Sequence, residues 1–461
     1  MNTPIAEHAQ DRTSAAALVA RCHGRLAALL GGDGNGVERL LVAYSGGLDS
    51  TVLLHIVREF CRRRALTLEA HHVDHALQAG SAAWSRHCQA TANRWGVAFT
   101  STRLRGSPPP GASVEDWARQ QRYASLLARC DSRTALLTAH HRDDQAETVL
   151  LHALRASGPH GLAGIRAHGH HGDTPLWRPL LEESRAQLQS YARGHGLEWL
   201  DDPSNEVLGF ARNRMRHTVL PVLEREFPGA ALALAEVARL QSEVVEVLDG
   251  VADQLLGDVE RLPLALLRGS AVALRPYLIK RWLKRRGAPA PGRTALQHML
   301  GEMLGARSDG QPQTAWQGVA VRRYDDCYFL TAAHLSVPPA APQAWPAPWT
   351  SLALAQGELR AINSSGSDAA SAALLAAAPL NVRYRAGGER LRLHARGPRR
   401  ELKHLFQEWR VPPWQRMRWP LLYVGEQLAV VPGLGVAAEF RVRDDEPGLQ
   451  ILWVGANSFA H

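Results

Sequence analysis

The stretch from Arg39 to Leu53, RLLVAYSGGLDSTVL, constrains the fold more than any other part of the chain. An apolar run typical of a buried strand, Leu40–Tyr44, precedes a Ser-Gly-Gly turn, and the apolar periodicity of a helix begins at Asp49. This order forms an anion site, because glycine lets the backbone approach a phosphate and the first amides of the helix point at it. The spacing and the lysine of a Walker A loop are missing. We therefore predict a phosphate-binding loop of another kind.

An acidic residue, Asp49, follows the two glycines of this loop. Its carboxylate would repel a phosphate unless a divalent cation lay between them, so we interpret Asp49 as a contact for Mg²⁺. For Ser-Gly-Gly alone an ordinary turn would be the simpler interpretation. The whole string SGGLDS after a strand, however, resembles the loop of the PP-loop (N-type) ATP pyrophosphatases, which cleave ATP between its α- and β-phosphates to adenylate a substrate. The resemblance implies ATP contacts at Ser45, Gly46, Gly47, Leu48, Asp49 and Ser50.

Strand and helix patterns alternate after the loop. They cover Leu66–Val73, Ser81–Trp95, Val97–Leu104, Val114–Cys130 and Thr134–Ala139 in turn. Alternation of this kind predicts an α/β fold with a doubly wound parallel sheet, and the resemblance implies the adenine nucleotide α-hydrolase-like version of it. Ligands of such sheets lie beyond the carboxyl ends of the strands. The loops after the first, second and fourth strands should therefore converge on the nucleotide.

The chain of 461 residues is too long for one ordinary core. We predict a catalytic domain over 1–225, a small helical substrate-binding domain over 226–335, a proline-rich linker over 336–349 and a small α+β end domain over 350–461. The helix pattern of 231–256 carries apolar residues at steps of three and four, which we attribute to core packing. They are Val237, Leu240, Val244, Leu248 and Val251. We expect the Ser/Ala-rich stretch 364–378 to form a mobile loop.

Lys+Arg 53 against Asp+Glu 44 gives a formal net charge of +9, which favours a polyanionic partner, although non-specific basicity is an alternative. The five cysteines are scattered and include no CxxC pair, as in proteins of a reducing compartment. Residues 1–14 show no secretory signal, and no apolar run is long enough to span a membrane. We expect a cytoplasmic protein without a membrane partner, and nothing in the sequence indicates a protein partner.

A second group of polar residues, HHRDDQAET at 140–148, lies where the fourth strand gives way to a helix. The spacing puts Asp144 and Glu147 on one helical face. Acids in a first turn are also ordinary partners of the helix dipole, but next to the phosphate loop they become candidates for binding a cation or an amine. Of the five histidines in this group and after the second strand, His75 and His140 are the best candidates for site contacts. We do not expect zinc, because no ligand set of zinc-type spacing accompanies them.

Two arginines, Arg119 and Arg122, lie three residues apart on the helix pattern after the third strand. A surface ion pair with Glu115, one turn earlier, would explain them without any function. The alternative is that one of them binds a phosphate or a substrate carboxylate through two parallel hydrogen bonds. The sequence leaves both interpretations open.

Beyond SGGLDS, several strings together resemble the tRNA(Ile)-lysidine synthetase family, strongly over about 40–220 and moderately over about 380–440. They are HVDH at 72–75, ExxARxxRY at 115–123, HHRDDQAET, RPLL at 178–181, DPSN at 202–205, RNRMRH at 212–217 and the segment 403–423. Two positions depart from the family pattern. Val207 stands where an acid usually follows DPSN, and Asp74-His75-Ala76 stands where an NHG-like turn is usual.

The resemblance implies an enzyme that adenylates the C2 oxygen of the wobble cytidine in the minor isoleucine tRNA with a CAU anticodon, releasing pyrophosphate. The ε-amine of L-lysine then displaces AMP, which gives lysidine and changes decoding from AUG to AUA. ATP and Mg²⁺ are the implied cofactors. Asp49, Asp144 and Glu147 would be catalytic. The lysine or tRNA contacts would come from His75, Arg119, Arg122, His140, Asn205, Arg212 and Arg216.

The end domain is expected to bind tRNA through a basic patch, since phosphate contacts position a nucleic acid on a protein. The patch residues are Arg383, Arg385, Arg390, Arg392, Arg396, Arg399, Arg400 and Lys403. The alternatives are a PP-loop tRNA thiolase, which typically needs sulfur-carrying cysteines, and a tRNA-binding protein with a degenerate nucleotide pocket. The intact SGGLDS and DDQAET strings argue against degeneration.

Overall fold

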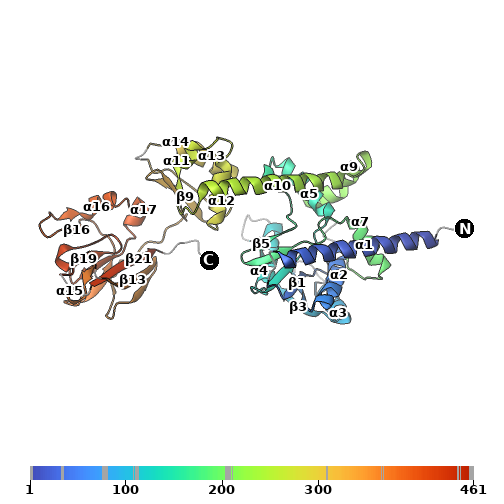
Figure 1. Cartoon of the computed structure of the whole chain (residues 1–461), viewed down its shortest axis with the longest axis horizontal. Helices are drawn as coiled ribbons and strands as arrows, with labels where there is room; N and C mark the ends of the chain where they lie inside the picture. Colours follow the sequence, from blue (N-terminus) through green and yellow to red (C-terminus); the bar gives the residue numbers. More distant parts are fainter. Residues whose placement is uncertain are drawn as a thin grey trace. The chain divides into compact units, whose positions relative to one another are not determined.

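The computed structural model describes the backbone of residues 4–32, 36–74, 81–106, 108, 114–202, 209, 211–307, 310–364, 366, 368–443, 446 and 448–455. The chain divides into two compact units, Met1–Val247 and Leu248–His461, whose elements are labelled in Figure 1. The domain limits predicted at residues 225, 335 and 349 are finer than this division and stay predictions. In the described ranges no helix has both the length and the apolarity needed to span a membrane.

The first unit contains a six-stranded sheet of order β3-β2-β1-β4-β6-β5. Its parallel strands are β1 (Arg39–Ala43), β2 (Thr67–Asp74), β3 (Ala98–Arg103), β4 (Thr134–Leu137) and β6 (Thr174–Trp177). The edge strand β5 (His168–His171) pairs antiparallel with β6. The helices are α1 (Pro4–Gly31), α2 (Leu48–Arg64), α3 (Ser81–Arg94), α4 (Val114–Leu127), α5 (Arg142–Leu154), α6 (Pro159–Leu162), α7 (Arg185–Gly194), α8 (Ala211–Arg214), the π-helical η2 (Met215–Val219), α9 (Leu220–Glu226) and the start of α10 (Ala230–Leu256).

Helices cover both faces of this sheet. Successive residues of β1 point to opposite faces, so that Leu40 and Val42 join a core with α1, α2, α3 and α7, and Leu41 joins a second core with Tyr123 and Leu126 of α4. A parallel sheet covered on both faces needs continuous apolar strands, and the central residues of β1 are fully buried. The predicted doubly wound α/β fold is confirmed, and the carboxyl ends of β1 and β4 lie side by side.

The second unit begins with a four-stranded antiparallel sheet packed on short helices. The strands are β7 (Leu262–Pro263), β8 (Gln313–Trp316), β9 (Val319–Tyr324) and β10 (Cys327–Ala332), and the helices are α11 (Leu264–Gly269), α12 (Arg275–Arg285), α13 (Arg293–Leu300) and α14 (Glu302–Gly305). Trp282 of α12 and Tyr328 of β10 are both buried in this core. The region thus combines short helices with an antiparallel sheet.

The rest of the second unit is a small α+β region of antiparallel sheets, as predicted. One sheet has the order β11 (Gln343–Ala344), β15 (Leu380–Arg383), β18 (Leu421–Val424), β19 (Gln427–Val431) and β20 (Gly435–Val436). A second sheet has the order β12 (Ser351–Leu354), β13 (Gly357–Ser364), β21 (Gly448–Gly455) and β14 (Ala370–Ser371), and a third pairs β16 (Arg390–Leu391) with β17 (Arg400–Glu401). The helices are α15 (Ala372–Leu375), α16 (Leu402–Glu408), α17 (Pro413–Arg416) and the 3₁₀ turn η3 (Ala438–Phe440). The stretch expected to be a linker contributes β11 and the buried Trp345 to this region.

Two sequence expectations outside the site are wrong. The apolar stripe of α10 is largely exposed, for example 46% at Leu240, and the buried face of this helix instead carries Ala238, Val245 and Ala252. Small residues let a helix pack closely, so side-chain bulk was a misleading signal for burial. The supposed mobile loop 364–378 contains β14 and α15, and Leu375 is fully buried because it packs against the sheets of the end domain.

Candidate active site

The phosphate loop has the predicted sequence of strand, turn and helix. The loop follows β1, and α2 begins at Leu48, so that the first amides of α2 lack a partner within the helix. Gly46 has a φ of +82°, a conformation that residues with a Cβ rarely adopt. The hydroxyls of Ser45 and Ser50 lie 3.0 Å apart and also accept hydrogen bonds from loop amides. These hydrogen bonds fix the conformation of the loop.

Asp49 lies in the first turn of α2, beside the carboxyl end of β4. Its Oδ1 is buried without a hydrogen-bond partner, and its Oδ2 lies 3.5 Å from Nε2 of His141. A buried carboxylate oxygen without a partner suits a cation, and Mg²⁺ commonly takes only one or two carboxylates together with phosphate oxygens. No cluster of three metal-ligating side chains exists in the described part of the chain. The residues present therefore fit an ion carried with a nucleotide, but not a cage made by protein alone.

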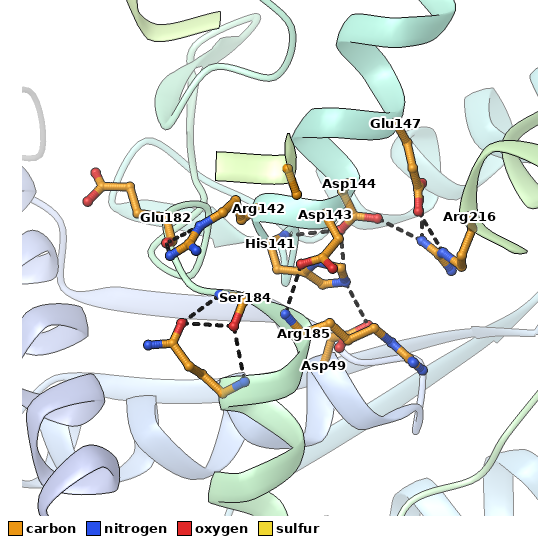
Figure 2. Close-up of polar contacts among 12 residues, drawn as sticks. Asp49, His141, Arg142, Asp143, Asp144, Glu147, Glu182, Ser184, Arg185 and Arg216 are labelled. Atoms are coloured by element: carbon orange, nitrogen blue, oxygen red, sulfur yellow. Dashed lines mark hydrogen bonds and ion pairs between the residues drawn. The ribbon is translucent and has the colours of Figure 1, made fainter. Parts of the chain in front are cut away.

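His141, at the start of α5, is fully buried among three carboxylates (Figure 2). Its Nε2 lies 3.4 Å from Asp144 and 3.5 Å from Asp49, and its Nδ1 lies 3.5 Å from Asp143. Burial alone would lower the pKa of His141, but Asp144, Asp143 and Asp49 outweigh it and raise the pKa to about 10. His141 is therefore a cation at neutral pH that links the phosphate loop to α5. Its role was not predicted from the sequence, although its place two residues before a pair of acids at a strand end was a usable signal.

Asp144 and Glu147 do share one face of α5, and two arginines occupy that face. Nε of Arg212 lies 2.7 Å from Glu147, and Nε of Arg216, labelled in Figure 2, lies 2.6 Å from the same carboxylate. Each arginine also donates to Oδ1 of Asp144 at 3.0 Å. The structure thus joins four of the predicted site residues in one network. Burial would raise the pKa of Asp144, but His141, Arg212 and Arg216 hold it well below its usual range.

The next cluster lies around Tyr123 of α4. The guanidinium groups of Arg119 and Arg122 lie 5.2 and 5.8 Å from the centre of its ring. Burial lowers the pKa of Arg178, which follows β6, and Tyr123 partly offsets this effect. The sequence indicates Arg178 only as part of the string RPLL. Its Nη1 donates to the carbonyl of Arg166 at 2.7 Å, and its Nε is buried without a hydrogen-bond partner.

His140 differs from its neighbour in the chain. It hydrogen-bonds Thr138 Oγ1 at 2.9 Å through Nδ1. Burial lowers its pKa to about 3, an effect that Arg178, Arg212 and Arg119 reinforce and Asp144 opposes. His140 is therefore neutral and lies near the arginines. The predicted contacts His75 and Asn205, as well as Val207, lie outside the described residues, and so does the side chain of Glu115.

Most arginines of the end-domain patch have carboxylate partners. The pairs are Arg383–Glu426, Arg385–Glu389, Arg390–Glu401, Arg392–Glu439, Arg399–Glu439 and Arg400–Glu408. Three of these acids lie outside 382–403 and reach the patch only through the fold. Its local charge is therefore lower than the sequence suggests, and its RNA-binding role stays a prediction.

Three family models match the chain in order. Residues 20–223 match a PP-loop domain, residues 262–329 a TilS substrate binding domain and residues 380–453 a TilS substrate C-terminal domain. Among solved structures, the U34-tRNA thiolase NcsA from Methanococcus maripaludis covers 49% of this chain and 79% of its own at 15% identity, and its TM-score of 0.40 is too low to support a conclusion.

Several curated relatives named tRNA(Ile)-lysidine synthase are similar over nearly their whole length. The protein of Alkalilimnicola ehrlichii is 38% identical over 89% of this chain and 92% of its own. That of Xanthomonas axonopodis pv. citri is 40% identical over 84% and 88%, and that of Pectobacterium atrosepticum is 35% identical over 91% and 95%. Because these relatives cover most of the chain and family matches occur in all three of its parts, the chain belongs to the tRNA(Ile)-lysidine synthase family.

Proposed function

We propose that this protein is the ATP-dependent ligase that converts the wobble cytidine of the minor isoleucine tRNA with a CAU anticodon into lysidine, so that the tRNA reads AUA instead of AUG. The observation that carries the proposal is the contact of His141 with both Asp49 and Asp144. It puts the phosphate loop and the acidic pair into one site. A reaction that first adenylates a base and then delivers an amine to it needs these two parts within reach of one atom.

The phosphate loop binds ATP through residues 45–50, and Asp49 holds Mg²⁺ through its unpartnered oxygen. When bound, Mg²⁺ neutralises the charge of the departing pyrophosphate. The cationic His141 orients the carboxylate of Asp49 before the nucleotide arrives. The arginines around Tyr123 supply further positive charge, and we assign Arg119 and Arg122 to a phosphate of ATP or the tRNA, or to the carboxylate of lysine.

Asp144 and Glu147 attract the ammonium group of L-lysine, with Arg212 and Arg216 at the edge of the same site. Because its pKa is so low, Asp144 is a poor base, and it suits a charged amine better than it suits proton removal. A base must take the proton when the amine attacks C2 of the cytidine and AMP departs, and Glu147 can do so only if Arg212 and Arg216 release its carboxylate. His75 and Asn205 remain assigned to the lysine or the base.

The segments matched by substrate-binding models, with the basic patch of the end domain, hold the tRNA. We also propose the limits 1–225, 226–335 and 350–461 for the catalytic, middle and end domains, joined by the segment 336–349. We expect the enzyme to act on tRNA in the cytoplasm.

A tRNA thiolase is the second candidate function. It would need a cysteine that carries sulfur, and one cysteine lies near the phosphate loop. Cys88 of α3 lies directly behind the phosphate loop, where its Sγ is 2.7 Å from the point that a Cβ on Gly46 would occupy. Burial, however, raises the pKa of the Cys88 thiol to about 12. A buried neutral thiol does not carry sulfur to a substrate, because the thiolate is the reactive form. This argues for an amine as the nucleophile.

Incubation with labelled lysine, ATP and total tRNA tests the proposal. Lysine should enter the tRNA fraction only with ATP, and pyrophosphate should be released. Labelled sulfur in the tRNA instead of lysine would identify a thiolase. Binding of tRNA with neither label incorporated would identify a degenerate enzyme, and either result would overturn the proposal.

A further inference from the structure

A phosphate loop works only if its amides point at the anion and its carbonyls point elsewhere. In this loop four successive carbonyl oxygens each accept a hydrogen bond. The bonds join Tyr44 O to His72 Nδ1 at 3.0 Å, Ser45 O to Trp84 Nε1 at 2.7 Å, Gly46 O to Leu200 N at 3.0 Å and Gly47 O to Thr51 N at 3.0 Å. Three of the donors come from other elements, so the surroundings hold the direction of the loop's carbonyls.

The bond from Trp84 is the shortest of these and comes from a side chain that can be altered without moving the backbone. An indole N–H is a donor only, so its role in this bond is unambiguous. The peptide between Ser45 and Gly46 is planar and trans, which makes its C=O and N–H point in opposite directions. By holding the carbonyl on the side of α3, Trp84 therefore aims the amide of Gly46 away from α3.

Helix α3 is packed tightly against this point of the loop. A Cβ on Gly46 would lie 3.1 Å from Nε1 of Trp84 in addition to its clash with Cys88. Residue 46 must therefore be glycine for space as well as for its positive φ. The close approach leaves the peptide little room to turn while the bond to Trp84 exists.

We propose that Trp84 is a positioning residue of the phosphate loop, whose indole N–H keeps the Ser45–Gly46 peptide turned so that its amide faces the phosphates of the nucleotide. This inference rests on the proposed function only for the identity of the ligand, ATP. Without the indole N–H, the Ser45 carbonyl loses its partner and can turn toward the phosphates, which it repels.

The test replaces Trp84 in the full chain with 3-benzothienylalanine, which has the shape of tryptophan but a sulfur atom in place of the N–H. ATP affinity, measured by calorimetry with ATP and Mg²⁺, should fall about tenfold, the scale of one lost hydrogen bond. The KM for lysine should stay unchanged, and the melting temperature should fall only by the small cost of one hydrogen bond. The matched control is the same replacement at Trp95, which packs on His55 and Arg58 and does not contact the loop; it should leave ATP affinity unchanged.

Unchanged ATP affinity in the Trp84 variant would overturn the inference. So would a parallel loss of melting temperature and of lysine affinity, because that pattern marks a packing role. Trp84→Phe, which lacks the donor but keeps an aromatic ring, should show the same selective loss of ATP affinity. If the unaltered protein fails to incorporate lysine but the Trp84 variant still binds ATP more weakly, the proposed function fails and this inference stands.

Discussion

Arginine–carboxylate pairs occur both at the candidate active site and on the end domain, but their surroundings differ. At the site the carboxylate of Glu147 is fully buried and serves two arginines. On the end domain Glu426 is 86% exposed and serves Arg383 alone. The first arrangement joins α5 to α8 and η2, whereas the second joins β15 to the turn between β18 and β19.

This difference in burial indicates which charged side chains can leave their partners to bind a ligand. A buried charge that loses its partner is strongly destabilising, because the remaining group stays desolvated and unpaired. An exposed pair contributes little, since water and salt screen it. We therefore expect the site network to be retained as a unit, while the arginines of the patch can exchange their glutamates for RNA phosphates.

The largest effect should come from breaking the buried network. Glu147→Ala would leave Arg212 and Arg216 without their closest partner, so the free energy of unfolding should fall by about 3–5 kcal/mol. Lysine incorporation should fall more than about a hundredfold, because the amine loses a carboxylate. Urea unfolding and labelled lysine measure the two effects. Glu426→Ala is the control and should change neither; equal stability of the two variants would refute the distinction between the regions.

Asp49→Asn tests the charge of the phosphate loop without changing its shape. Lysine-dependent release of pyrophosphate should fall about 10²- to 10³-fold, since the charge that holds the cation is lost. The melting temperature should also fall, because the buried and cationic His141 loses the charge of one of its three carboxylate partners. A titration with Mg²⁺ should show a raised requirement for the ion. Activity close to that of the unaltered protein would remove Asp49 from the mechanism.

The adjacent histidines should respond to pH in opposite directions. The pKa of His141 rises on folding from about 6.5 to about 10, so its contribution is complete below pH 6.5 and is lost as the pH rises toward 10. The pKa of His140 falls on folding to about 3, so it costs stability only as the pH falls below 6.5. Unfolding of His141→Gln should lack the alkaline loss, and that of His140→Gln should lack part of the acid loss. Identical pH profiles for both variants would contradict the assigned charges.

The parts of the site that the sequence predicts correctly are local. The strand, the Ser-Gly-Gly turn and the helix of Asp49 are adjacent in the chain, and the spacing of Asp144 and Glu147 fixes their common face. Both follow from backbone geometry within one or two turns, which a sequence pattern can report.

The parts that the sequence does not predict depend on distant contacts. Arg212 lies 65 residues from Glu147 in the chain, so a pattern cannot show that the two pair. The charge of His141 follows from three carboxylates, one of them in another element. In the same way, Glu426 lies 43 residues from Arg383, and a count over a sequence window assigns the patch more free charge than it has.

The smallest effect we expect concerns the basic patch of the end domain. It tests whether the arginines of the patch exchange their glutamates for RNA phosphates. In the described part of the chain no carboxylate lies within ion-pair distance of Arg396 or Lys403. Arg396→Ala with Lys403→Ala should therefore weaken tRNA binding several-fold and reduce the slope of log K against log salt by about two. If exposed pairs exchange, Arg383→Ala should also reduce the slope, by about one. If it leaves the slope unchanged while the double variant reduces it, the glutamates keep their arginines, and the end domain binds RNA through its unpaired charges alone.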